Sequence, residues 1–154
     1  MIAEWISRIF GTSSSEKCDV FFSYRQSDSQ VVVASLVEAL GNLGVTCWVD
    51  KDRLELGGGI RKQIAKAIDE STLHLVVVSE GSRHSQWIDK ELRTILNRET
   101  RTGVKSLVPL YVSTRIDETV HPGELAERAG LRWNNNPQEI AVLIQRRLDE
   151  MKST

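Results

Sequence analysis

Hydrophobic and polar positions follow two different periods along most of the chain. Short apolar runs such as CDVFFSY and LHLVVVS are typical of buried strands, whereas apolar residues spaced three and four apart predict helices. Strands are expected at residues 18–24, 45–50, 73–79, 106–112 and 131–133, and helices at 28–42, 60–69, 87–96 and 137–151. Residues 113–130 are expected to be irregular and partly helical.

This alternation of strands and helices predicts an α/β fold with helices on both faces of a parallel sheet. The runs VFFS and LVVVS are continuously apolar, as expected of strands covered on both sides. Right-handed crossovers favour a flavodoxin-like, doubly wound, five-stranded sheet in the order 2-1-3-4-5. Ligands of such sheets bind outside the carboxyl ends of the strands where the order reverses, which places residues 23–29 and 79–85 at the predicted crevice.

The core is expected to contain the apolar stripes of the helices and the tryptophans of the strands. Trp48 and Trp133 are interpreted as core residues, and His74 and Cys47, each within a predicted strand, as structural. The helical stripes comprise Val31, Val32, Leu36, Val37, Ala39 and Leu40 in the first helix and Ile60, Ile64, Ala67 and Ile68 in the second.

The first 16 residues differ from the rest and are expected to form a short amphipathic helix and a polar hinge before a domain at 17–154. Its apolar positions are Ile2, Trp5, Ile6 and Ile9, while Glu4 and Arg8 interrupt the run that a signal peptide would need. Docking on its own domain is the simpler interpretation, and membrane contact by residues 1–10 is the alternative. No apolar run approaches the roughly 20 residues of a membrane span.

Composition narrows the chemistry further. The formal net charge of −1 provides no field to recruit nucleic acid. Two cysteines are too few for a disulfide framework and show no metal-ligand spacing, which fits a cytoplasmic protein. The chain also lacks a P-loop, a GxGxxG turn and a GxSxG nucleophile elbow.

One stretch beside the predicted crevice, SRHSQWIDKEL, places Trp87 and Glu91 four residues apart. Residues at this spacing share a helix face, so the ring and the carboxylate can line one side of the crevice. The alternatives are half-buried packing with a solvated acid, or a pocket in which the ring forms a wall and the acid acts on a substrate.

Five motifs in sequence order resemble a TIR (Toll/interleukin-1 receptor) domain over residues 17–151. They are DVFFSYR, WVDKDRLELGGGI, VVVSEGSRHSQWIDKEL, LVPLYV and LRWNNNPQEIAVLIQRRL. TIR domains comprise scaffolds and enzymes that cleave the nicotinamide–ribose bond of NAD, and the enzymes carry a glutamate four residues after a tryptophan. The resemblance therefore implies an NAD nucleosidase or ADP-ribosyl cyclase with Glu91 as the catalytic residue. NAD enters as the substrate, and no cofactor or metal is implied.

The resemblance also suggests substrate-binding positions around the crevice. Arg25 is either a partner for the pyrophosphate or a solvated loop cation, and Asp52 either faces the crevice or is a surface acid of the loop after the second strand. The serines of this region can bind substrate or simply cap helices and turns. The proposed set is Ser23, Tyr24, Arg25, Asp52, Ser79, Ser82, Ser85 and Trp87.

The chain resembles minimal bacterial TIR proteins of anti-phage defence, in which the product is a messenger for a separate effector. Assembly with other TIR protomers is expected. The alternative is a non-enzymatic scaffold that self-associates or mimics host TIR signalling. The loop DRLELGGG has glycines and lacks the proline that receptor-type members often have, which argues against the receptor-adaptor type but leaves self-association through this loop open.

Overall fold

The fold is built from four helices and five strands in the part of the chain that the computed structural model describes, which is residues 17–24, 26–49, 57–79, 86–112, 125 and 128–153. The side chains of residues 26–28 and 86–89 are outside this description, and so are residues 1–16 with their predicted helix and hinge. The elements are β1 (Cys18–Ser23), α2 (Gln26–Asn42), β2 (Cys47–Trp48), α3 (Ile60–Glu70), β3 (Ser71–Val78), α4 (Gln86–Thr102), β4 (Leu107–Tyr111), β5 (Leu131–Arg132) and α6 (Pro137–Lys152).

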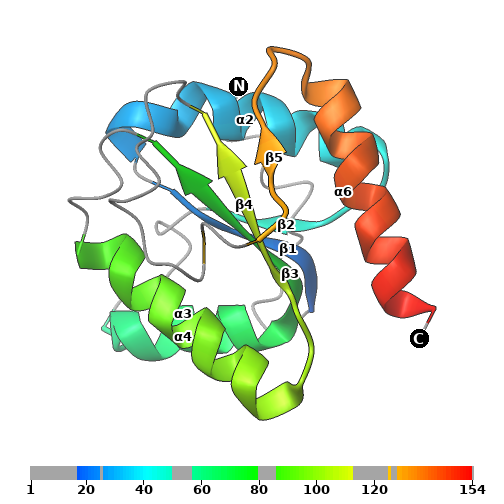
Figure 1. Cartoon of the computed structure of the whole chain (residues 1–154). Helices are drawn as coiled ribbons and strands as arrows, with labels where there is room; N and C mark the ends of the chain where they lie inside the picture. The colour runs from blue at the N-terminus through cyan, green and yellow to red at the C-terminus, as the bar shows by residue number, and fades with distance from the viewer. Residues whose placement is uncertain are drawn as a thin grey trace.

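The strands form a parallel sheet in the order β2-β1-β3-β4-β5, which confirms the predicted flavodoxin-like topology. Figure 1 shows α3 and α4 together on one side of the sheet and α2 and α6 on the other. Each pair covers its own hydrophobic cluster, because β1 and β3 are apolar on both faces. The strand order reverses between β1 and β3, as the sequence predicts.

Strand β2 is shorter than the predicted 45–50 and contains only Cys47 and Trp48. It lies at the sheet edge, where β1 is its single partner. Side-chain hydrogen bonds extend the pairing just before it, because the Thr46 amide donates to Asp19 Oδ2 and the Asp19 amide donates to Thr46 Oγ1, both at 3.0 Å. These bonds fix the register in which Val20 faces Cys47.

Two residues of the predicted helical stripes are exposed, which corrects the expected core. Val31 is 82% exposed, whereas Val33 faces the sheet together with Leu36. Three consecutive valines cannot all face inward on a helix, because successive residues are about 100° apart. Ile60 is 52% exposed because it is the first residue of α3 and precedes the turn that packs.

The two strand-associated tryptophans lie at the margin of the core and are half-buried. Trp48 stacks on Phe21 with 5.1 Å between ring centroids, and Trp133 follows β5 and donates from Nε1 to Asn135. The structural interpretation of His74 and Cys47 is confirmed, since both are fully buried. In the described part of the chain, no helix combines the length and apolar character that a bilayer crossing requires.

Candidate active site

The carboxyl ends of β1 and β3 bring three of the predicted site residues to one edge of the sheet. Ser23 ends β1 and pairs with Val76 in the neighbouring strand β3, while Ser79 directly follows β3. Both serines are buried, and Tyr24 beside Ser23 is half-buried. The carboxyl edge of the sheet at the β1–β3 reversal, where the crevice is predicted, therefore contains polar side chains.

Two hydroxyl groups near this edge lack hydrogen-bond partners within the described part of the chain. They are Ser23 Oγ and Ser29 Oγ, both fully buried. An unsatisfied buried hydroxyl costs about 1–3 kcal/mol, so such groups mark places where a ligand or water belongs. Sequence reasoning did not single out Ser29, although it lies on the same helix face as the buried Val33.

Glu91 lies in the second turn of α4 and is only 4% exposed. Its neighbours Leu92 and Ile95 pack against the sheet in the cluster that contains Phe21 and Val76. The carboxylate is therefore beside the sheet-facing stripe of the helix, on the side that meets α3. There it lines a cavity of about 250 Å³ between α3 and α4.

This cavity, called the α3–α4 cavity below, has a strongly cationic lining. It forms where the N-terminal halves of two helices meet, because each helix follows a parallel strand and so begins at the carboxyl edge. Glu91 is the one acid among its described lining residues, and three are cations. The complete lining is Arg61, Ile64 and Ala65 from α3, and Lys90, Glu91, Arg93, Thr94 and Asn97 from α4.

Of the residues that line this cavity, the sequence assigned only Glu91 to the site. A usable signal was present in helix spacing, since Arg61, Ile64 and Ala65 are at i, i+3 and i+4, and Thr94 is at i+3 from Glu91. What the sequence could not provide was the pairing of α3 with α4. The resulting site can attract an anionic group to its rim and present a fixed carboxylate to a cationic centre.

The other predicted site residues stand apart from this cavity or outside the description. Ser23, Tyr24 and Ser79 do not line it. Trp87 lies in α4 one turn before Glu91, as predicted, but its side chain is outside the described residues. The same holds for the whole of Arg25, Asp52, Ser82 and Ser85. Within the described ranges, no three His, Cys, Asp or Glu residues form a group suited to a metal ion.

A family model described as TIR domain matches residues 20–145. The chain belongs to the TIR domain family. This TIR domain is 30% identical to the 2′ cyclic ADP-D-ribose synthase AbTIR of Acinetobacter baumannii over 80% of the chain and 46% of that protein. It is 28% identical to the NAD(+) hydrolase TcpC of Escherichia coli over 65% of the chain and 33% of that protein. The TIR domain thus spans less than half of either relative.

Solved structures support the same fold. The TIR domain of the Toll-related receptor TRR-2 from Hydra magnipapillata superposes with a TM-score of 0.65 at 23% identity, over 88% of this chain and 98% of that one. At this identity the likeness establishes the architecture only.

Proposed function

We propose that this TIR domain cleaves the nicotinamide–ribose bond of NAD with Glu91 as the essential carboxylate. The observation that carries the proposal is the position of Glu91. Its side chain is only 4% exposed, yet it lines a cavity in which the other charged residues described are cations. NAD has the complementary pattern, with an anionic pyrophosphate and a cationic nicotinamide ring. The relatives AbTIR, a 2′ cyclic ADP-D-ribose synthase, and TcpC, an NAD(+) hydrolase, support the same assignment.

The chemistry requires one carboxylate and little else. The C1′–N bond breaks with its electron pair going to the pyridinium nitrogen, so nicotinamide leaves as a neutral molecule without a general acid. Positive charge develops on C1′ and the ribose ring oxygen, where the Glu91 carboxylate stabilises it. The cations Arg61, Lys90 and Arg93 are suited to hold the pyrophosphate.

Water adding to C1′ completes hydrolysis and releases a proton, giving ADP-ribose. A hydroxyl or ring nitrogen of the bound molecule adding instead gives a cyclic product. We propose further that assembly with other protomers enables turnover and that the product signals to a separate effector in bacterial anti-phage defence. The first of these rests on the resemblance to TIR enzymes, many of which are active only when assembled across protomers, and the second on the resemblance to minimal bacterial TIR proteins.

Turnover of NAD by the purified chain tests the central proposal. Wild type, Glu91→Gln and Glu38→Gln are incubated with NAD over a range of protein concentrations, and products are identified by chromatography and mass spectrometry. Glu38 is an exposed glutamate on α2 and serves as the matched control. We expect nicotinamide release by wild type and Glu38→Gln, and a loss of at least about a hundredfold in Glu91→Gln. Equal rates in all three proteins would remove Glu91 from its assigned role.

A second candidate function is a non-enzymatic scaffold that self-associates. It is favoured by the apolar side chains that α2 and α6 leave exposed, notably Val31 and Val142. Sedimentation of wild type and Val31→Lys distinguishes the two functions. The scaffold predicts association that Val31→Lys weakens, with no nicotinamide release at any protein concentration.

A further inference from the structure

A larger groove lies on the opposite face and edge of the sheet from Glu91. It has a volume of about 610 Å³ and is bounded by the first residues of β3 and β4, by β5 and by α6. Its floor is apolar and includes Leu73, Leu107 and Ile144. A volume of this size is in the range of pockets that hold small organic ligands. We call it the α6 groove.

Three cations from three separate segments border the α6 groove, and its described lining contains no acid. Lys105 precedes β4, Arg128 precedes β5, and Arg147 comes from α6. Arg128 reaches the start of β4, two residues after Lys105, because its Nη1 donates to the Leu107 carbonyl at 3.3 Å. Convergence of like charges is unfavourable without an anion between them, so the arrangement favours a negatively charged ligand.

The three cations differ in how far their charge is already compensated. Arg128 forms an ion pair with the buried Glu99, and Arg147 approaches Glu150 at 3.5 Å on the exposed side of α6. Lys105 takes part in none of the ion pairs formed among the described residues. Lys105 is therefore the cation with the most charge to offer a ligand.

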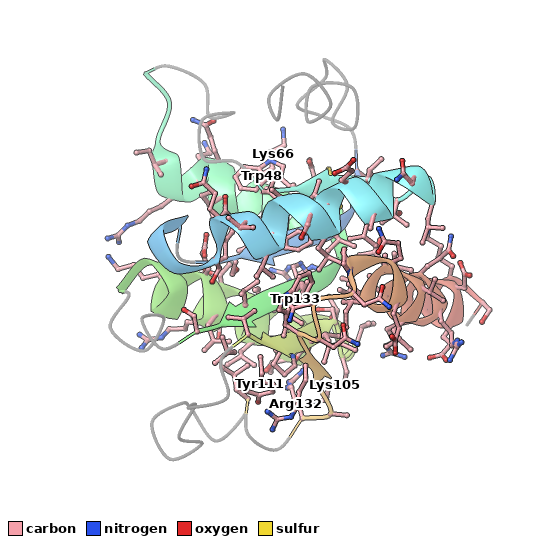
Figure 2. The ribbon with its side chains drawn as sticks, turned by 90° about the horizontal axis from the view of Figure 1, so that it is seen from above. Trp48, Lys66, Lys105, Tyr111, Arg132 and Trp133 are labelled. Carbon is pink, nitrogen blue, oxygen red and sulfur yellow. The ribbon has the colours of Figure 1, made fainter. Side chains whose placement is uncertain are left out.

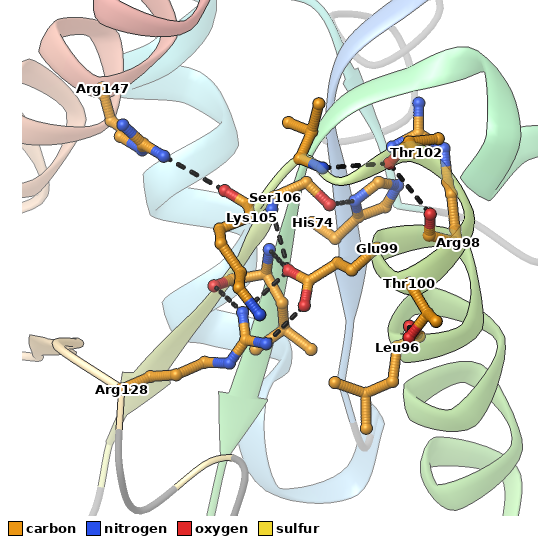
Figure 3. Close-up of polar contacts among 12 residues, drawn as sticks. His74, Leu96, Arg98, Glu99, Thr100, Thr102, Lys105, Ser106, Arg128 and Arg147 are labelled. Atoms are coloured by element: carbon orange, nitrogen blue, oxygen red, sulfur yellow. Dashed lines mark hydrogen bonds and ion pairs between the residues drawn. The ribbon is translucent and has the colours of Figure 1, made fainter.

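The walls of the groove are fixed before any ligand arrives. Arg128 donates to Glu99 and to the Leu107 carbonyl, and Arg147 Nη2 donates to the Lys105 carbonyl at 3.1 Å (Figure 3). These bonds hold the backbone beneath Lys105 against α6 and the segment before β5 against β4. A rigid site loses little conformational entropy on binding, which raises its affinity.

We propose that the α6 groove binds a small soluble molecule with an apolar body and one anionic group, such as a phosphate monoester, sulfonate or carboxylate. The apolar floor accounts for the body, and Lys105 with its neighbouring arginines accounts for the anion. Neither part alone suffices, because a bare phosphate leaves the floor unfilled and a neutral tail leaves the cations uncompensated. The α6 groove lies on the opposite face of the sheet from Glu91 and at the opposite edge, so its binding of a ligand does not depend on the proposed NAD activity.

Octyl phosphate is the probe for this proposal, measured by isothermal titration calorimetry below its micelle concentration. Inorganic phosphate supplies the head alone, and octyl glucoside supplies the same tail with a neutral head. The variants are Lys105→Glu and Leu143→Glu, which place an acid at the rim and on the half-exposed wall of the groove. Lys66→Glu is the matched control, because Lys66 and Lys105 lie on opposite sides of the molecule (Figure 2).

We expect octyl phosphate to bind wild type and Lys66→Glu equally, and to bind each groove variant about tenfold more weakly. Inorganic phosphate and octyl glucoside should both bind more weakly than octyl phosphate. Equal affinity for Lys105→Glu and wild type would overturn the proposal, as would equal affinity for the neutral and anionic octyl probes. Preferential binding to phosphatidylglycerol vesicles over monomeric octyl phosphate would also overturn it, since the occupant would then be a membrane.

Discussion

Two glutamates on helix α4, Glu91 and Glu99, are buried to nearly the same degree, with 4% and 5% of their surface exposed. Glu99 is surrounded by protein donors, since Arg128 contacts both of its oxygens and the amides of Ser106 and Leu107 both donate to Oε2 at 2.8 Å (Figure 3). Glu91 instead lies on the wall of the α3–α4 cavity. Residue type, helix and burial are matched, so the proposed difference in role rests on the cavity that Glu91 lines.

The electrostatics of Glu99 agree with a structural role. Burial acts to raise the pKa of this carboxyl, but the hydrogen bonds from Arg128, Leu107 and Ser106 and the nearby guanidinium charge outweigh it, and the pKa lies below its ordinary value. The charged form is thus the one that the fold stabilises. Glu99 connects α4, the start of β4 and the segment before β5 through one side chain.

The largest effect expected from this comparison is a crossed pair of variants. Glu99→Gln leaves Arg128, whose side chain is 18% exposed, without its charge partner, and should lower the free energy of unfolding by roughly 3–5 kcal/mol. Glu91→Gln keeps the size of the side chain and should lower it by less than Glu99→Gln does. Urea denaturation of both variants beside wild type measures the difference.

The same two variants should show the opposite order of effects on NAD turnover. Glu99→Gln, assayed at a temperature where it remains folded, should keep the NAD turnover of wild type per folded molecule, while Glu91→Gln loses it. If Glu91→Gln proved the less stable protein, or Glu99→Gln the inactive one, the division between structural and catalytic acid would be wrong.

As the pH falls, protonation of His74 should lower the free energy of unfolding before protonation of the glutamates does. His74 is fully buried with Nδ1 2.8 Å from Ser106 Oγ and Nε2 2.6 Å from the Ile68 carbonyl. Burial is the main cause that lowers its pKa from 6.5 to about 4, and Arg98 adds to this while the bond to Ile68 and the acids Glu99 and Asp69 oppose it. In the unfolded chain His74 therefore becomes protonated near pH 6.5, whereas in the folded chain it becomes protonated only near pH 4.

Stability contributed by neutral His74 is complete above pH 6.5 and falls by about 3 kcal/mol as the pH drops to 4. The pKa of Glu99 is also lowered, but from the ordinary glutamate value, so its contribution is lost only as the pH falls below the ordinary glutamate range. Urea midpoints between pH 7 and 4 test the first window, with His74→Gln as the non-titrating control. A wild-type slope equal to that of His74→Gln between pH 6.5 and 5 would contradict the assignment.

The sequence was sufficient for the sheet and for the helical position of Glu91, and insufficient for the cavity around it. Continuous apolar runs in β1 and β3 identify central strands because only doubly covered strands lack polar positions. The helical position of Glu91 follows from local spacing. By contrast, Arg61 and Arg93 come together only through the packing of α3 on α4, which no local pattern encodes.

The same reason explains why sequence reasoning overlooked Glu99. A glutamate amid polar residues of an exposed helix end looks solvated, and its partner Arg128 is 29 residues away in a stretch predicted to be irregular. The exposed Val31 is the reverse error, because an apolar residue adjacent to a buried stripe looks like part of it. Pairing across segments decides both cases, and single-sequence periodicity contains no information on pairing.

A smaller loss of stability is expected from Gly130→Ala, which tests the segment that Arg128 anchors. A Cβ at Gly130 would lie 2.8 Å from both Cγ and the carbonyl oxygen of Pro109, and 3.0 Å from Tyr111 Cε2. The backbone of β4 cannot move aside easily, so the variant should lose about 1–3 kcal/mol in urea denaturation. Gly59→Ala is the control, because its nearest contact would be Lys62 Cβ at 3.8 Å. Comparable losses in the two variants would contradict a packing role for Gly130.

The smallest effect is expected from Asp69→Asn, the exposed counterpart of the Glu99 pair. Asp69 joins α3 to α4 through Arg101 at 2.7 Å and Arg98 at 3.5 Å, but its side chain is 61% exposed. Water and salt screen such pairs, so the variant should lose less than about 1 kcal/mol and the loss should shrink in high salt. Urea denaturation at low and high ionic strength, beside Glu99→Gln, makes the comparison. A salt-independent loss as large as that of Glu99→Gln would mean that number of ion pairs, and not desolvation of the acid, determines how strongly α4 is held.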